Sequence, residues 1–178
     1  MMKEDALSEC LKNESNQETT QFSELSALEL VTLINSADMT VANAVKKELP
    51  AIAKAVERIT ERLQKGGRIF YVGAGTSGRL AVLDSAECPP TFGVSPALVQ
   101  AIIAGGHDAM LKAVENIEDS QEAAIEELQR RHVSDKDVVI GIAASGRTPF
   151  TVAALQYGKK LKALTVSITT RGKSMMSE

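Results

Sequence analysis

RIFYVGAGTSGRLAVLDSAECPPTF, residues 68–92, is the stretch that decides the fold of this chain. It begins with an apolar run at residues 69–72, passes through a turn with glycines at 73, 75 and 78, and continues with helical spacing as far as Pro89. A strand, a Gly-rich loop and a helix start in this order present backbone N–H groups and a positive helix end to an anion. Because the helix also carries the carboxylate of Glu87 near its end, an anion cradle and a candidate acid or base lie close together in the sequence.

The composition is that of one folded domain with a hydrophobic core. Hydrophobic residues make up 44% of the 178 residues and charged residues 24%. A net charge of −3 gives no electrostatic footprint for nucleic acid or an anionic membrane. The two cysteines form no disulfide or zinc pattern, and neither a signal peptide nor an 18-residue apolar run is present. We therefore expect a cytoplasmic protein.

Apolar segments alternate with helical patterns after residue 92. We predict strands at 97–104, 137–144 and 163–168 and helices at 108–131 and 149–161, in addition to the strand and helix of the opening stretch. Apolar strands separated by helices indicate an α/β fold with a parallel sheet covered on both faces.

Helices are also predicted before the opening stretch. Ser26 and Glu29 have capping-box spacing and start a short helix that ends near Asn35. A longer pattern opens at Thr40, and Pro50 should divide it into two helices in line or kink one helix. Its apolar stripe packs on the chain's own sheet or forms a seam between subunits. The predicted organisation is a flexible arm at 1–22, N-terminal helices at 23–66 and a ligand-binding domain at 67–178.

Two loops at the carboxyl ends of predicted strands offer the same chemistry. Each combines hydroxyls, a glycine and an arginine just before a helix, which suits a phosphate. The candidate binding residues are Thr76, Ser77, Gly78, Ser145, Gly146, Arg147 and Thr148. The first loop also matches G-x-G-x-x-G, but residues 91–106 contain no Asp or Glu to hold a ribose, which disfavours a dinucleotide. The alternative is that these glycines and hydroxyl residues only form tight turns and bind no ligand.

Two carboxylates are candidates for acid–base chemistry. Glu87 precedes Cys88 and two prolines at the end of its helix. Glu118 falls on the apolar stripe of the helix predicted at 108–131, where it is either partly buried with a raised pKa or at the edge of the stripe. His107, at the end of the second strand, is a further candidate. Cys88 has no histidine nearby and is best interpreted as a packed thiol.

The motifs GAGTSGRLAVLDSAECPPTFGV, IIAGG, ENIEDSQEAA and GIAASGRTPF together resemble those of the N-acetylmuramic acid 6-phosphate etherases, members of the sugar isomerase (SIS) domain superfamily. The resemblance implies a three-layer α-β-α SIS domain with a flavodoxin-like parallel sheet. It also implies a cytoplasmic homodimeric lyase, with a site near the subunit interface and no metal or organic cofactor. Glu87 matches the family's acid, which protonates the departing lactyl oxygen, and Glu118 matches the base that takes the C2 proton. Ser77, Ser145, Thr148 and the backbone of Gly146 would hold the phosphate and the sugar hydroxyls.

Two other functions remain open at this stage. The glucokinase regulatory protein shares the SIS loops, so a non-catalytic sensor of sugar phosphates is one alternative, although it usually lacks the intact ECPPT block. An aldose–ketose phosphosugar isomerase of the same superfamily is the other. Family members continue beyond the position of Glu178. We therefore expect a C-terminally truncated domain with an open sheet edge and with weak or no turnover unless dimer contacts compensate.

Overall fold

The computed structural model describes residues 22–114 and 116–177. The chain forms two units, Met1–Ala53 and Lys54–Glu178, and each is considered by itself. The predicted arm at 1–22 lies outside the described residues except for Phe22, and Cys10 lies outside them as well.

A capping box starts the helix of the first unit, as predicted. The short helix η1 (Phe22–Glu24) precedes α2 (Ala27–Gln64). The Ser26 backbone N–H and hydroxyl both donate to Glu29 Oε2, at 2.8 and 2.6 Å, and the Glu29 N–H donates to Ser26 Oγ at 3.3 Å. These reciprocal bonds satisfy donors that the helix start would leave free.

The α2 helix does not end near Asn35, so that expectation is wrong. It also continues through Pro50, which leaves the single helix and not the two helices in line of the alternatives given for this proline. Hydroxyls at the expected break bond back into the helix, since the Ser36 hydroxyl donates to Thr32 O at 2.8 Å and the Thr40 hydroxyl to Ala37 O at 2.7 Å. Hydroxyls satisfied in this way are tolerated inside a helix. No helix of the described residues is long and apolar enough to cross a membrane.

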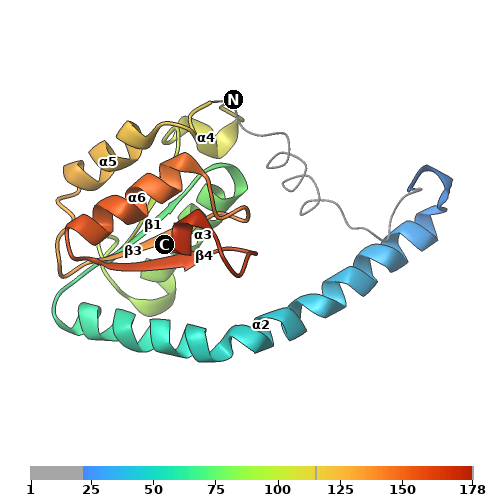
Figure 1. Cartoon of the computed structure of the whole chain (residues 1–178), viewed down its shortest axis with the longest axis horizontal. Helices are drawn as coiled ribbons and strands as arrows, with labels where there is room; N and C mark the ends of the chain where they lie inside the picture. The colour runs from blue at the N-terminus through green and yellow to red at the C-terminus, as the bar shows by residue number, and fades with distance from the viewer. Residues whose placement is uncertain (1–21, 115, 178) are drawn as a thin grey trace. The chain divides into compact units, whose positions relative to one another are not determined.

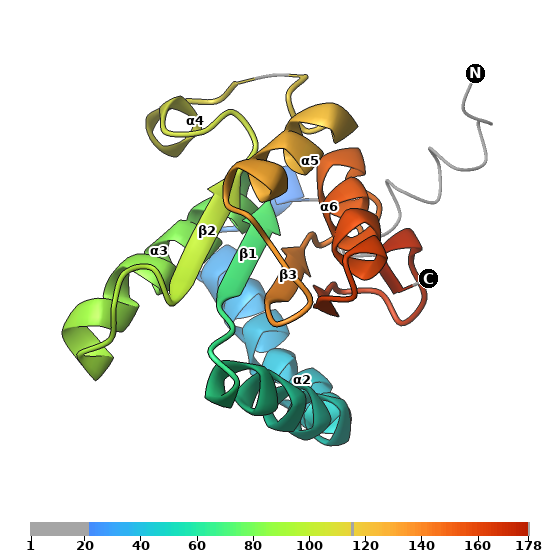
Figure 2. The same cartoon turned by 90° about the vertical axis from the view of Figure 1, so that its left-hand side faces the viewer.

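The second unit is built on a four-stranded parallel sheet, which confirms the predicted α/β class (Figures 1 and 2). The strands are β1 (Ile69–Gly73), β2 (Val99–Ile103), β3 (Val138–Ile142) and β4 (Leu164–Ile168), and they lie in the order β2-β1-β3-β4. Each falls inside a predicted strand or extends it by one residue, because apolar side chains on both faces mark a covered parallel strand.

Helices cover both faces of this sheet. On one face, Phe70, Val72 and Val139 pack against the buried side chains of α5 (Gln121–Arg130) and α6 (Pro149–Lys160). On the other face lie α3 (Gly75–Phe92) and the last turns of α2, where Ile59 and Leu63 pack on the sheet. Figure 2 shows α5 and α6 on one side of the strands and α3 on the other.

The single helix predicted at 108–131 is wrong, because the chain forms α4 (Asp108–Leu111) and then a loop before α5. Asn116 adopts a left-handed conformation with φ 63°, which breaks a right-handed helix. Ser120 then starts α5 by accepting a bond from the Ala123 N–H at 3.3 Å. Glu118 consequently lies in a turn.

The α3 helix does not stop at Pro89 but continues through Pro89 and Pro90 to Phe92. Its end is set by Gly93, whose left-handed backbone (φ 65°) lets its N–H donate to Pro89 O at 2.8 Å. The two prolines remove only donors near this end, where the freed carbonyls lie on a partly exposed surface that water can reach. Glu87 therefore sits within the helix.

Candidate functional site

The strand order reverses between β1 and β3. From β1 the chain crosses to β2 on one side and returns to β3 on the other, while α3 and α6 leave from the carboxyl ends of β1 and β3. In open parallel sheets this switch point is where ligands bind. The two hydroxyl-rich loops predicted to bind phosphate are the two loops that flank it.

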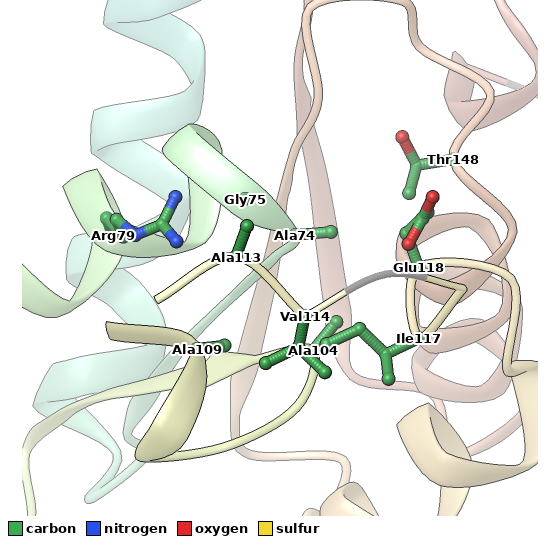
Figure 3. A pocket seen from close by; sticks show the side chains of 10 residues that line it. All are labelled: Ala74, Gly75, Arg79, Ala104, Ala109, Ala113, Val114, Ile117, Glu118 and Thr148. Carbon is green, nitrogen blue, oxygen red and sulfur yellow. The ribbon is translucent and has the colours of Figure 1, made fainter. Parts of the chain in front are cut away.

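A cavity of about 370 Å³ opens at this point (Figure 3). Its walls come from the start of α3, the start of α6, the end of β2, and α4 with the loop that follows it. The lining residues are Ala74, Gly75, Arg79, Ala104, Ala109, Ala113, Val114, Ile117, Glu118 and Thr148. Only two of them are charged. Figure 3 shows Glu118 and Thr148 on one side of the cavity and Arg79 on the other.

The N-termini of α3 and α6 both reach this cavity without a side-chain cap. Ala74 has no side-chain group to cap α3, and Thr148 makes no capping bond to α6. By contrast, α5 is capped by Ser120. The α3 start therefore offers N–H groups to this space, whereas at the α6 start Pro149 has no N–H and the Phe150 N–H donates to Glu118 O. Both helices direct a positive dipole end at the cavity, which favours an anion there.

Tight backbone packing shapes the first loop. Gly75 takes a left-handed φ of 53°, and a Cβ on Gly78 would lie 2.6 Å from Ile103 Cγ1. Thr76, Ser77 and Gly78 lie in the first turn of α3, at the carboxyl end of β1. Thr76 is exposed and Ser77 half-buried, so both hydroxyls are accessible, although neither lines the cavity itself.

Hydrogen bonds within the loop and from the segment after β4 hold the second loop in place. The Ser145 hydroxyl accepts a bond from the Arg147 N–H at 3.4 Å, and Gly146 O accepts one from the Met176 N–H at 3.1 Å. Gly146 has a φ of 66°, and a Cβ there would meet Ser174 Cβ at 2.4 Å. Of the seven predicted binding residues, Thr148 is the one that lines the cavity.

Glu118 lies at the rim of the cavity. Its side chain is exposed, which favours the edge alternative over burial, although in a turn and not on a helix. Its carbonyl accepts a bond from the Phe150 N–H at 2.9 Å, which ties this turn to the first turn of α6. A carboxylate fixed at the mouth of an anion-binding cavity can take a proton from a bound ligand.

Glu87 does not line the same cavity. It is exposed on α3, twelve residues after Gly75, which corresponds to about 18 Å along the helix axis. Closeness in sequence to the phosphate loop therefore did not bring Glu87 to the cavity within one copy of the chain.

The other candidate side chains also lie outside the cavity lining. His107 is exposed at the start of α4. Cys88 is half-buried on α3, and burial together with the nearby Asp84 carboxylate raises the pKa of its thiol, as fits a packed side chain. In the part of the chain that the structure describes, no three His, Cys, Asp or Glu side chains could hold a metal ion.

Sequence reasoning missed two parts of the site. The first is its apolar wall, made by Val114, Ile117 and small alanines, and the second is the contact of Arg79 with the loop that carries Glu118. The alanines around the Gly105-Gly106 turn were a usable signal, because small residues leave room for a ligand. Nothing in the sequence marked Arg79 as a partner of residues more than thirty positions away.

A family model matches this site and most of its scaffold. The model for the glucokinase regulatory protein N-terminal SIS domain matches residues 51–159, which include both loops, Glu87 and Glu118. The chain belongs to the SIS-domain family. The SIS fold expected from the motifs is thereby confirmed.

Curated relatives agree with the resemblance seen in the motifs. Proteins named N-acetylmuramic acid 6-phosphate etherase from Clostridium beijerinckii and Glaesserella parasuis are 54% and 52% identical to this chain over 89% and 97% of its length. The matches cover 53% and 57% of those relatives, so the chain spans about half the length of the relatives it matches. The resemblance to the etherases is confirmed.

Solved SIS-type structures share the fold. A phosphoheptose isomerase from Francisella tularensis superposes with a TM-score of 0.61 at 23% identity, covering 82% of this chain and 76% of that one. A phosphoheptose isomerase from Neisseria gonorrhoeae also gives a TM-score of 0.61, at 18% identity, over 79% of this chain and 72% of that one. At these identities the likeness concerns the fold alone.

Proposed function

We propose that this chain acts as an N-acetylmuramic acid 6-phosphate etherase, a cytoplasmic lyase that needs no metal or organic cofactor. The observation that supports the proposal most directly is the convergence of the first turns of α3 and α6 on one cavity that has Glu118 at its rim. This arrangement suits a phosphorylated substrate with an acidic proton. The names of relatives about half identical to this chain support the same substrate.

The reaction follows from the chemistry of the open-chain sugar. The aldehyde makes the neighbouring C2 proton acidic, and the Glu118 carboxylate takes it. The electron pair left on C2 forms the C2–C3 double bond as the C3–O bond to the lactyl group breaks. A protonated Glu87 gives its proton to the departing oxygen, which releases D-lactate. Water then adds at C3, and N-acetylglucosamine 6-phosphate is formed.

The phosphate would be held at the two helix starts. The N–H groups of the first turn of α3 and the hydroxyls of Thr76 and Ser77 would lie on one side of the phosphate, and Gly78 lets this turn pack closely against Ile103. Ser145, Gly146, Arg147 and Thr148 would form the opposite side, and of these Thr148 lines the cavity. Charge-assisted bonds of this kind are about twice as strong as neutral ones, so they can fix the sugar relative to Glu118.

In a homodimer, Glu118 of one copy and Glu87 of the other could act on the same substrate. Because Glu87 lies about 18 Å along α3 from Gly75 and about 12 Å from Arg79, the last α3 residue in the cavity lining, we assign the acid to a second copy of the chain. We assign the dimer contact to the α2 stripe Val41, Val45, Leu49, Ile52 and Val56. These side chains are between 43% and 56% exposed and recur at three- and four-residue spacing.

Release of D-lactate tests the function. The purified chain is incubated with N-acetylmuramic acid 6-phosphate, and lactate is measured by a coupled dehydrogenase. Glu118→Gln should lower the rate at least a hundredfold, whereas Asp119→Asn, the exposed neighbour, should leave it unchanged. If the chain binds the substrate but releases no lactate, and if Glu87→Gln leaves this binding unchanged, the result would support a regulatory protein like the one for which the family model is named.

Complementation tests whether the site is shared between copies. Glu87→Gln and Glu118→Gln are each expected to be inactive. In an equal mixture with subunit exchange, half of the dimers are mixed and each holds one intact site, so about a quarter of the wild-type rate should return. A mixture as inactive as its components would contradict the shared site.

A further inference from the structure

The segment between α4 and α5 has few contacts that hold it in place. It runs from Lys112 to Ser120 without regular structure among its described residues. Its last part is fixed by the Glu118 carbonyl on α6 and by Ile117, which is packed so closely that a Cβ on Gly105 would lie 2.1 Å from Ile117 Cδ1. The end that carries Glu118 is therefore held against α6, and how the segment lies relative to α3 depends on its other end.

Arg79 holds that other end. Its Nε donates to Met110 O at 3.4 Å, and its Nη2 donates to Lys112 O at 3.1 Å. These carbonyls lie at the end of α4, where helix carbonyls lack partners within the helix. Among the described residues Arg79 makes no salt bridge. Its guanidinium donates to backbone carbonyls, and its side chain lines the cavity.

The position of Arg79 on α3 gives this contact its importance. Arg79 is one turn after Gly75, at the helix start where the phosphate is proposed to bind. One rigid helix thus carries both the anion-binding N–H groups and the tie to the Glu118 loop. A lysine ammonium can also donate to carbonyls, but it is a point charge on a flexible stem and lacks the rigid planar fork with which the guanidinium holds two carbonyls.

We infer that Arg79 is a positioning residue that fixes the loop of residues 112–118, and with it the Glu118 carboxylate, relative to the phosphate-binding start of α3. The inference rests on the proposed function only for the catalytic consequence of the tie, since the tie itself is present without substrate. The alternative for Arg79 is a direct contact with the phosphate and no role in holding the loop.

Hydrogen–deuterium exchange of the full chain without substrate tests the tie. Arg79→Ala should raise exchange of the amides at 112–120 by about threefold to tenfold, the effect of losing one or two weak hydrogen bonds, and should leave β1 and β3 unchanged. Arg79→Lys should give a smaller rise, and it also serves if Arg79→Ala fails to fold. Arg130→Ala, which removes an exposed ion pair with Glu127, should have no effect on this segment.

Kinetics separate positioning from phosphate binding. Arg79→Lys should lower kcat by about tenfold or more with a smaller change in KM, because the misplaced group is Glu118. Unchanged exchange in both Arg79 variants would overturn the inference, as would a rise in KM alone. If the Arg79 variants show increased exchange but the wild-type chain releases no lactate, the contact of Arg79 with the loop is supported and the proposed function is refuted. The two failures are therefore distinguishable.

Discussion

Replacing Asp137 by asparagine should destabilise the second unit by breaking a buried charge cluster at the amino ends of the strands. Asp137 is 2% exposed and lies directly before β3. Its Oδ1 accepts bonds from Arg68 N at 2.9 Å and Nε at 3.1 Å, and its Oδ2 accepts bonds from Arg68 Nη2 at 3.0 Å and from Ser134 N and Oγ at 2.8 and 3.0 Å. Every acceptor position of the carboxylate is therefore used.

The magnitude follows from these contacts. Removing one partner of a buried ion pair costs about 3–5 kcal/mol. Because the Arg68 side chain is 32% exposed and keeps its bonds to the Arg131 and His132 carbonyls, the lower end applies, about 3 kcal/mol. With a urea m-value of about 2 kcal/mol per molar, the unfolding midpoint should fall by about 1.5 M.

Urea unfolding followed by circular dichroism measures this loss, with Asp135→Asn as the matched control. Asp135 is exposed two residues away, and its side chain makes no hydrogen bond or ion pair among the described residues. Its midpoint should stay within the error of the wild type. An Asp137→Asn midpoint equal to that of Asp135→Asn would refute the view that this cluster stabilises the sheet.

Acid should remove the same stabilisation. Burial opposes ionisation of Asp137, but the bonds from Arg68 and Ser134 outweigh it and hold the pKa of this carboxyl below its usual range. A lowered folded pKa means that the contribution is complete above the unfolded pKa of about 3.9 and is lost as pH falls through the folded pKa. The gap between wild type and Asp137→Asn should therefore narrow below about pH 4.

Three further results are expected. Gly105→Ala should lower the free energy of unfolding by about 2 kcal/mol, because the added Cβ would clash with Ile117. Gly106→Ala should lower it by only about 1 kcal/mol, because its Cβ meets nothing within 4 Å and only the left-handed backbone is unfavourable. Thermal melts compare the two variants. Thr148→Val should raise KM by about tenfold at unchanged kcat in the lactate assay. Ile52→Lys should weaken dimerisation at least about tenfold in sedimentation velocity, unlike Ala51→Lys.

The strands were predictable because each is buried on both faces. Val138 and Ile140 face one side of the sheet and Val139 the other, and all three are buried, so the sequence shows an unbroken apolar run. The two loops could be found for a related reason. Close packing such as that of Gly78 against Ile103 permits only glycine, and this leaves a visible mark in the sequence.

The region from 108 to 131 was mispredicted because apolar spacing records burial and not helicity. Val114 and Ile117 are apolar because they line the cavity, and they happen to continue the spacing of α4 and α5. The local signal for a break was Asn116, whose side chain tolerates a left-handed backbone. A single such residue is too weak a signal to overrule a long periodic pattern.

The α2 stripe left two alternatives open, and the structure confirms packing on the sheet for one end of it, while the subunit seam stays a prediction for the rest. Ile59 and Leu63 pack on the sheet of the second unit, as one alternative requires. The residues from Val41 to Val56 stay exposed, which is what a subunit seam would need before its partner arrives. A sequence pattern cannot separate these cases, because burial in the chain's own core and burial in a partner select the same side chains.

Glu87 shows why motif proximity and site proximity differ. The elimination needs a base at C2 and an acid at the oxygen on C3, so the two groups must reach adjacent carbons of one substrate. A helix that begins at the phosphate carries any later residue away from it by 1.5 Å per position, and twelve positions exceed the length of a single sugar. If both glutamates act, α3 must present Glu87 to a cavity other than its own. The helix that builds the phosphate site in one copy would then supply the acid to the next.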